Sequence, residues 1–503
     1  MRLELSRTLS LPCCLILFFI TCYILLCHCA SFTFPLPWPD ESDFLWQAIA
    51  FKDTNSLLSP ALNPQRAIMW MPPGYMIVTG MLFKIFGFSF VFARAISLAF
   101  MIISFILITL LTRQYGFDIS SVLLCGLFFL NRRFIATGNV ARMEAMLLCV
   151  VCLGFVMLQR NMTYNGLVLL LLSPFIHPNG LYFIGGACIY YFTIGRGKLR
   201  ERDFTKFDLA LISLSVALVL SYLLYVALHW QWFRHDMAIQ FARKVKSSTP
   251  RHMFNRGNLS TLFLILFCYL YCVKKQIHAV FLLFLGAPAL LVKLVGTEMW
   301  YDVFDGIGHL LLFILVVHVA YNLAAAATAP FRQITMAALA LPLIWWGYSI
   351  HWIENPFNYA SYPKWHEMQM PKSDDVPYMT NSDIKTIEAT LKSRCAHRHR
   401  THIGFIPRAD GLFFQNMSRE GIQIINPLFY DYTRVGNVYI VHMSRYTPKG
   451  QARKLRRLFL RTGINPEEHV ILKRDGTEVW YYYALKEGDL EKISAALDPK
   501  RRL

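Results

Sequence analysis

Charged residues are scarce in this chain. Lysine, arginine, aspartate and glutamate make up 16% of its 503 residues, whereas hydrophobic residues make up 55%. Ordinary soluble domains carry roughly 25% charged residues, so the composition excludes a chain that is soluble throughout. Apolar runs of about 15 to 24 residues recur as far as Trp352, and runs of that length can cross a bilayer. The sequence therefore predicts a polytopic α-helical membrane protein.

The chain also lacks the signatures of several common sites. It has no Walker loop, no GxGxxG element and no HExxH motif, which leaves nucleotide, dinucleotide and zinc-protease sites without support. Of its twelve cysteines, only Cys395 lies beyond the apolar part, so neither a disulfide framework nor a zinc-ligand spacing is present. No metal ligand and no certain cofactor are assigned, and a divalent metal is left open.

Lysine and arginine in short loops give the orientation of the predicted spans. These spans, about eleven in all, are 9–30, 94–112, 117–135, 142–159, 165–178, 180–195, 208–230, 260–273, 277–295, 306–326 and 332–352. With the N-terminus inside, the cytoplasmic loops hold Arg113, Arg160, Arg196, Lys198, Arg200, Arg202, Lys274, Lys275 and Arg332. This count places the region after residue 352 on the extracytoplasmic side.

Two apolar runs need separate treatment. The run 9–30 follows Arg2 and Arg7 and is too long for a typical signal-peptide core, so we interpret it as a retained anchor. The run 69–90 is interrupted by prolines, glycines and Lys84. We place it in the first external loop as juxtamembrane or re-entrant helices, because irregular backbone at membrane depth requires a protein or water-filled cover.

Basic residues also occur on the outer side, against the orientation rule. The loop 231–258 holds Arg234, Arg243 and Lys244 among others, while Arg94 and Arg142 open the second and fourth spans. Phosphate is the natural partner of such cations. The alternative is contact with anionic lipid headgroups. No nucleic-acid-reading fold is evident.

Titratable residues from several loops meet at the same outer level in this topology. They are Asp40 and Glu41 after the first span, Arg94, Arg142, Glu144, His177 at the end of the fifth span, and Tyr301 between the ninth and tenth. A carboxylate beside a phosphate-binding cleft is suited to group transfer from a lipid phosphate, with the carboxylate as general base. Alternative readings are that Asp43 caps a helix beginning at Phe44, that Glu144 only pairs with Arg142, and that His177 only caps its helix.

The order of these motifs resembles the C-superfamily integral-membrane glycosyltransferases, in the branch of the protein O-mannosyltransferases and the lipid A aminoarabinose transferase. The matching pieces are Pro39-Asp40-Glu41, Pro72-Pro73-Gly74-Tyr75, Phe92-Ala93-Arg94-Ala95, Ala141-Arg142-Met143-Glu144-Ala145 and His177-Pro178-Asn179-Gly180. The resemblance covers roughly residues 1–352. It departs from the family at Glu144, where many relatives have aspartate, and at His177, where the aminoarabinose branch has Lys-Gly.

This resemblance implies a polyprenyl-phosphate sugar donor, an outward-facing cavity, and Asp40 as catalytic base with Glu41 as the second acidic residue. Arg94, Arg142, Glu144, His177, Arg234, Arg243, Lys244 and Tyr301 are then expected to bind donor phosphate or substrate. The expected enzyme transfers a hexosyl or pentosyl group to a lipid, glycan or protein acceptor, in a bacterial inner membrane. The alternatives are a flippase for a lipid-linked sugar, although internal hydropathy repeats are not seen, and a non-catalytic sensor.

The region 353–503 is expected to form a small extracytoplasmic α/β domain beside a transmembrane module of residues 1–352. Stretches rich in β-branched and aromatic residues predict strands near 402–407, 421–429, 435–442, 468–473 and 478–485. Helical spacing is seen at 382–394, 451–463 and 487–498. The segment RKLRRLFLR is basic and amphipathic, which indicates either contact with lipid headgroups or a solvated helix face.

Overall fold

The protein is described here by a computed structural model. The described residues are 14, 16–22, 39–63, 66–113, single positions between 125 and 138, 140–194, 205–245, 256–295, 301–325, 381–395, 402–406, 411–425 in part, 438–443, 449–474, 477–486 and single positions to 496. The chain forms two compact units. The helical unit comprises 1–32, 69–75 and 94–359, and the sheet unit comprises 33–68, 76–93 and 360–503.

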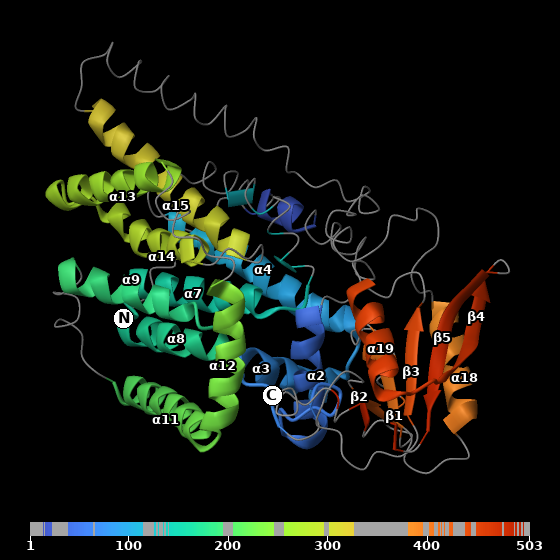
Figure 1. Ribbon diagram of the computed structural model, residues 1–503. Coiled ribbons are helices and arrows are strands. Elements are labelled where there is room, and N and C mark those ends of the chain that lie inside the picture. The colour runs from blue at the N-terminus through green and yellow to red at the C-terminus, as the bar shows by residue number, and fades with distance from the viewer. Residues whose placement is uncertain are drawn as a thin grey trace. The chain divides into compact units, whose positions relative to one another are not determined.

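The helical unit is built from a series of helices, most of them apolar (Figure 1). They are α4 (Phe90–Arg113), α7 (Met143–Gln159), α8 (Thr163–Ile176), α9 (Gly180–Thr193), α11 (Lys206–Leu228), α12 (Trp230–Val245), α13 (Arg256–Lys274), the short 3₁₀ helix η2 (His278–Leu282), α14 (Leu283–Val295) and α15 (Asp302–Ala325). Local signals set several ends. At α11, for example, the Thr205 hydroxyl accepts from the Asp208 N–H, and the Asp208 carboxylate accepts from the Thr205 N–H. This reciprocal cap satisfies N–H groups that have no partner inside a helix.

The predicted span 94–112 and the predicted spans from 142–159 to 306–326 largely coincide with these helices. The intervals 9–30 and 117–135 are described only in part, and 332–352 lies outside the described residues. The count of eleven spans therefore stays a prediction. In the described part of the chain, helices long and apolar enough to cross a membrane are Phe90–Arg113, Asp208–Leu228, His278–Val295 and Asp302–Ala320.

Glycines permit close packing between helices of this unit. A Cβ atom on Gly166 of α8 would lie 2.7 Å from the backbone oxygen of Gly154 on α7. A Cβ atom on Gly186 of α9 would lie only 2.3 Å from the backbone oxygen of Phe284 on α14. Close backbone approach at small residues is the usual way in which membrane helices associate, since lipid tails provide no hydrophobic drive between them.

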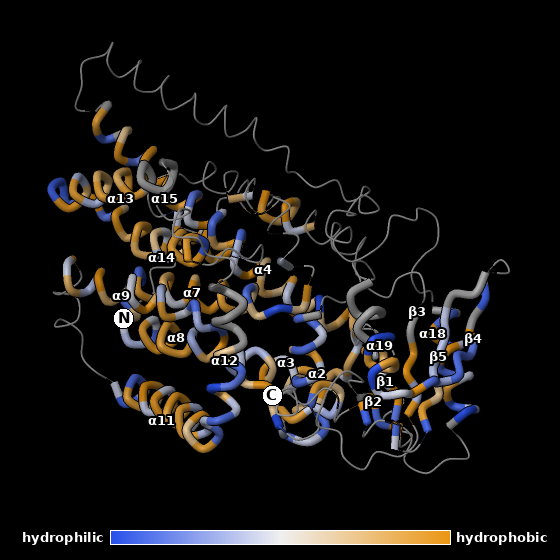
Figure 2. The backbone as a smooth tube through the Cα atoms, viewed as in Figure 1, coloured by the Kyte–Doolittle hydropathy of each residue, from blue (hydrophilic) through white to orange (hydrophobic). Residues whose placement is uncertain are grey.

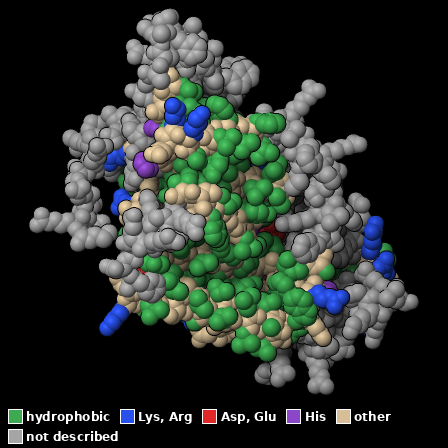
Figure 3. All heavy atoms as spheres, turned by 90° about the vertical axis from the view of Figure 1, so that its left-hand side faces the viewer, with side chains coloured by type: hydrophobic (Ala, Val, Ile, Leu, Met, Phe, Trp, Pro, Cys, Tyr) green, Lys and Arg blue, Asp and Glu red, His purple; other side chains and the backbone are tan. Residues whose placement is uncertain are grey.

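The outer surface of the helical unit is strongly apolar. Along α11, Leu209, Leu214, Leu220, Leu224 and Leu228 are exposed. Figure 2 shows hydrophobic colouring along α8, α9, α11 and α13. Figure 3 shows one face of the molecule on which hydrophobic side chains cover most of the described surface, with lysine and arginine toward its margins. Such a surface matches the lipid-facing side of a membrane bundle.

The sheet unit contains a five-stranded mixed sheet of order β2-β1-β3-β5-β4. The strands are β1 (His402–Ile406), β2 (Gln423–Ile425), β3 (Val438–Met443), β4 (Glu467–Arg474) and β5 (Thr477–Leu485). β1 is parallel to β2 and β3, whereas β5 is antiparallel to β3 and β4. A strand is therefore present in each of the five intervals where β-branched and aromatic residues predict one.

Helices from both ends of the sequence complete the sheet unit (Figure 1). They are α2 (Pro39–Thr54), most of α3 (Gly74–Phe86), α18 (Asn381–Cys395) and α19 (Lys449–Thr462). A Cβ atom on Gly411 would lie 3.3 Å from Cζ2 of Trp46 on α2. The boundary predicted at residue 352 lies outside the described residues. An independent extracytoplasmic domain of residues 353–503 therefore stays a prediction.

Helices α2 and α3 refine the expectations for the first loop. The run 69–90 does contain a short helix, α3, whose 13 residues span roughly 20 Å, less than a bilayer core. Helix α2 begins at Pro39, so the expectation that Asp43 caps a helix starting at Phe44 is wrong. Proline is favoured at the first helical position because its missing N–H would have no partner there.

Candidate functional site

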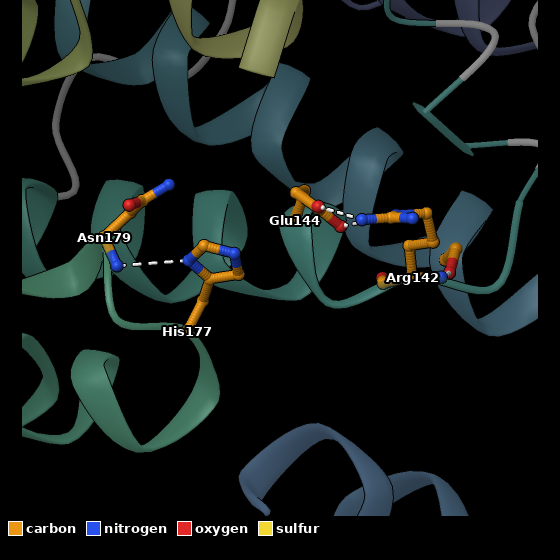
Figure 4. A network of polar contacts seen from close by, with 5 residues as sticks. Arg142, Glu144, His177 and Asn179 are labelled. Carbon is orange, nitrogen blue, oxygen red and sulfur yellow. Dashed lines mark hydrogen bonds and ion pairs between the residues drawn. The ribbon is translucent and has the colours of Figure 1, made fainter. Parts of the chain in front are cut away.

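A buried ion pair lies at the start of α7. Arg142 is 2% exposed and Glu144 is 1% exposed. The Arg142 Nε–H donates to Oε2 of Glu144 at 3.1 Å, and an Nη2–H donates to Oε1 at 2.8 Å. This two-pronged geometry is the strongest form of arginine–carboxylate contact. The reading that Glu144 pairs with Arg142 is therefore confirmed (Figure 4).

Ser97 holds the backbone of this pair against α4. Arg142 is extended, with φ −134° and ψ 158°, and it immediately precedes α7. Its N–H donates to the hydroxyl of Ser97 at 3.3 Å, and that hydroxyl lies 3.5 Å from the Arg142 carbonyl oxygen. Arg94 lies three residues before Ser97 on α4 and is fully buried. Residues three apart share one helix face, so α4 presents Arg94 on the same side as the Arg142 contact.

His177 occupies the tight turn between α8 and α9. Its backbone N–H donates to the Ser173 carbonyl, and its own carbonyl accepts from the Gly180 N–H at 2.9 Å. The N–H of Asn179 donates to Nδ1 of His177 at 3.1 Å, which fixes the imidazole and leaves Nδ1 unprotonated (Figure 4). The His177 backbone ends α8 as the capping alternative predicts. The side chain is buried within the unit.

Two further groups belong to the surroundings of His177. The ring of Tyr301 meets the imidazole edge-to-face, with ring centroids 5.8 Å apart and planes at 86°. The charge of Glu144 also interacts electrostatically with His177. Glu144 lies at the start of α7, His177 at the end of α8 and Tyr301 just before α15. The three residues thus form one polar cluster of the helical unit. With Arg142, they form the group that we call the buried cluster.

The predicted carboxylates lie in the other unit. Asp40 and Glu41 occupy the first turn of α2. Asp40 is half-buried and Glu41 is fully buried. Carboxylates in the first turn of a helix are favoured by the partial positive charge of its N–H groups. The two residues therefore share a local environment that stabilises negative charge.

The three outer-loop cations expected to bind phosphate, Arg234, Arg243 and Lys244, lie on α12. Arg234 is exposed to solvent in the helical unit. Arg243 and Lys244 lie on the same helix, but their side chains are outside the described residues. Their expected role in phosphate binding stays a prediction.

Asp236 is a polar contact that sequence reasoning missed. This buried carboxylate on α12 accepts from the backbone N–H of Met69 at 2.8 Å, across 167 residues of sequence. It holds the segment 69–75, which contains Pro72-Pro73-Gly74, within the helical unit. A Cβ on Gly74 would lie 2.6 Å from the carbonyl oxygen of Phe175, two residues before His177. The only sequence signal was an acid within a basic helix, which does not identify its partner.

Among the residues that the structure describes, no group of three or more His, Cys, Asp or Glu side chains is arranged to hold a metal ion. The helical unit provides buried arginines and an oriented imidazole, and the sheet unit separately provides a carboxylate pair on α2. Arginines in this setting are suited to hold a phosphate, and carboxylates are suited to accept a proton.

Comparisons with known proteins reveal similarity in fold but not in sequence. No family model and no curated protein matches the chain. The crystal structure of ArnT from Cupriavidus metallidurans bound to undecaprenyl phosphate matches with a TM-score of 0.53 and 10% identity, over 93% of this chain and 98% of that one. The apo structure of the same protein matches with a TM-score of 0.51 and 10% identity, over 95% and 98%. The resemblance inferred from the sequence is thus confirmed as a likeness in fold to ArnT.

Proposed function

We propose that the chain is a glycosyltransferase that moves a sugar from a polyprenyl-phosphate donor to an acceptor at the extracytoplasmic face of the membrane. The observation that carries the proposal is the burial of Arg94 and Arg142 in an apolar helical unit. Arginine in such surroundings is costly and marks a site that meets an anion or a counter-charge. The fold likeness to ArnT, seen bound to undecaprenyl phosphate, supports a lipid phosphate as that anion.

In this proposal the arginines hold the donor phosphate. Glu144 engages Nε and Nη2 of Arg142, so it orients the guanidinium and sets which edge faces a ligand. Arg94 supplies the second cation. As the bond between the sugar and the phosphate breaks, charge grows on the phosphate oxygens, and oriented cations stabilise that charge. Glu144 is therefore a positioning residue.

Asp40 is proposed as the general base. An acceptor hydroxyl or amine attacks the anomeric carbon of the donor, Asp40 takes the proton of the attacking group, and polyprenyl phosphate leaves with the electron pair of the broken C–O bond. Asp40 is the more accessible carboxylate of the first turn of α2, whereas Glu41 is fully buried. This difference favours Asp40 for proton transfer and Glu41 for orienting basic groups.

His177 and Tyr301 are proposed to line the sugar-binding part of the site, and Arg234, Arg243 and Lys244 to attract the anionic donor. The sugar is a hexose or pentose, and the acceptor is a lipid, a glycan or a protein. The proposed location is a bacterial inner membrane with the C-terminal region outside. The apolar surface of the helices supports a multi-pass arrangement.

The test combines purified full-length protein with a polyprenyl-phosphate sugar and cell-envelope extract. Sugar transfer that depends on Asp40 supports the proposal. Movement of the lipid-linked sugar across a vesicle membrane without transfer would instead identify a flippase. If neither occurs with any of a panel of hexosyl and pentosyl donors, the proposal fails.

A further inference from the structure

Helix α19 of the sheet unit has two contrasting faces. Its inner face consists of Leu455, Leu458 and Phe459, which pack in one core with Val438 and Leu485 of the sheet. Phe459 also meets Tyr483 edge-to-face, with ring centroids 5.4 Å apart. The helix is thus fixed to the sheet by its apolar stripe, and the opposite face points away from that core.

The outer face is basic and carries one large apolar side chain. Arg456, Arg457 and Arg461 are exposed, and Leu460 is 82% exposed. The sequence of the helix, KGQARKLRRLFLRT, contains no acidic residue. Three other cations of the sheet unit, Lys392, His469 and Lys492, form ion pairs with neighbouring carboxylates.

A leucine surrounded by arginines distinguishes between kinds of partner. Arg456 and Arg457 precede Leu460 by four and three residues, so all three share a helix face with Arg461 beside them. A purely polyanionic partner such as nucleic acid would use the cations and leave the leucine in water. At a bilayer surface both are used, since arginines meet headgroup phosphates while an apolar side chain enters the acyl boundary.

The rest of the chain tethers α19 to such a surface. The apolar helices of the helical unit belong to the same polypeptide as α19 and match the lipid-facing side of a bundle. A tether of this kind turns weak binding to the bilayer into an intramolecular event. A few charges then suffice to keep the helix face bound to the membrane surface. We propose that the outer face of α19 binds the surface of a bilayer that contains anionic phospholipid, with Leu460 inserted between headgroups.

The experiment uses full-length protein in lipid nanodiscs, with the photo-crosslinking change Leu460→p-benzoylphenylalanine. One nanodisc contains phosphatidylcholine alone and the other also contains phosphatidylglycerol. The control is Ala389→p-benzoylphenylalanine at an exposed position of α18. After irradiation, mass spectrometry identifies what is attached to each probe.

The expected result is a phosphatidylglycerol adduct at position 460 and none above background at 389. Combining the probe with Arg456→Gln, Arg457→Gln and Arg461→Gln should lower that adduct at least about tenfold, because cations near an anionic surface supply the electrostatic attraction to it. These positions are exposed, so the unfolding transition should not change. Equal yields at 460 and 389 would overturn the proposal, as would yields unaffected by the glutamine changes. Adducts with a co-purified protein instead of lipid would assign the face to a protein partner.

This inference is independent of the proposed sugar transfer. Loss of transfer in Asp40 variants leaves the α19 adduct unchanged, and loss of the adduct does not alter the chemistry proposed for Asp40. The two proposals can therefore fail separately.

Discussion

Gly186 of α9 faces the backbone carbonyl of Phe284 on α14, and a Cβ on Gly186 would lie 2.3 Å from that oxygen and 2.7 Å from Cγ of Pro288. Its neighbour Gly185 has nothing within 4 Å of the same added atom. The two glycines share a helix and differ only in the side that they face. They provide a matched test of helix packing in the unit that holds the buried cluster.

Gly186→Ala is expected to lower the free energy of unfolding by about 1–3 kcal/mol, because α9 must move away from backbone atoms of α14. Gly185→Ala should be neutral or slightly stabilising, since alanine is preferred in helices by about 0.5–1 kcal/mol. Reversible unfolding in mixed micelles measures both. Equal effects of the two changes would show that α9 does not contact α14 in this way.

The Arg142–Glu144 pair allows a double-mutant cycle. Arg142→Met leaves Glu144 buried without its counter-charge and should cost about 3–5 kcal/mol of stability. Combining it with Glu144→Leu removes both charges and should recover most of that loss. The double variant should remain inactive in transfer, since the proposed phosphate contact is absent. Costs of the two single changes that simply add would show that the two side chains are not coupled.

Asp40→Asn should lower sugar transfer by about 10²–10⁴-fold, the range expected for a general base. The change keeps size and hydrogen bonding, so donor binding and unfolding should not change. Asp53→Asn, on the exposed last turn of the same helix, is the matched control and should retain full transfer. If Asp40→Asn keeps most of its turnover, Glu41 becomes the next candidate for the base.

Tyr483 makes the stability of the sheet unit sensitive to alkali. Burial raises the pKa of Tyr483, and Glu468 raises it further. The phenol is neutral when protonated, so the unfolded chain loses this proton at a lower pH than the folded chain does. The contribution of the neutral Tyr483 phenol to the free energy of unfolding is thus fully present below about pH 10, and it is lost as pH rises above that value. Tyr483→Phe should reduce this alkaline loss, and the difference in phenolate absorbance between the two proteins should titrate above the ordinary tyrosine range. A difference curve centred at or below that range would contradict the prediction.

Cys395 tests the orientation. It ends α18, and the predicted topology places this helix outside the membrane. An impermeant thiol reagent should label it in intact spheroplasts, with Cys395→Ser as the control. Labelling that appears only after lysis would place α18 inside and would change the predicted number of spans.

The sequence predicts those features that depend on local pattern. Apolar runs mark α4, α7 to α9, α11 and α13 to α15, and β-branched and aromatic residues mark the strands. The Arg142–Glu144 pair is likewise local, since the two residues are only two positions apart in one motif. The sequence pattern misplaces the start of α2 because Asp43 is a good capping residue, whereas the helix already includes Pro39.

Long-range contacts could not be predicted in the same way. The bond between Asp236 and the Met69 N–H joins side chain to backbone, and any residue at position 69 could supply that N–H. The close approach of Trp46 to Gly411 joins positions far apart in the sequence, which composition does not encode. Such contacts decide which segments share a compact unit, so the two units could not be traced from hydropathy.

The membership of α2 and the sheet in one unit has a consequence for biosynthesis. Residues 41–50 of α2 are buried, yet Gly411 and the strands beside it are translated only after the apolar helices have been made. The ribosome therefore releases α2 long before the surface against Trp46 exists, and this part of the protein can mature only once the chain is nearly complete. A nonsense mutation just after Cys395 would leave the described apolar helices in place. It would still remove Gly411 and its strands, which α2, the helix that carries Asp40, needs as its partner.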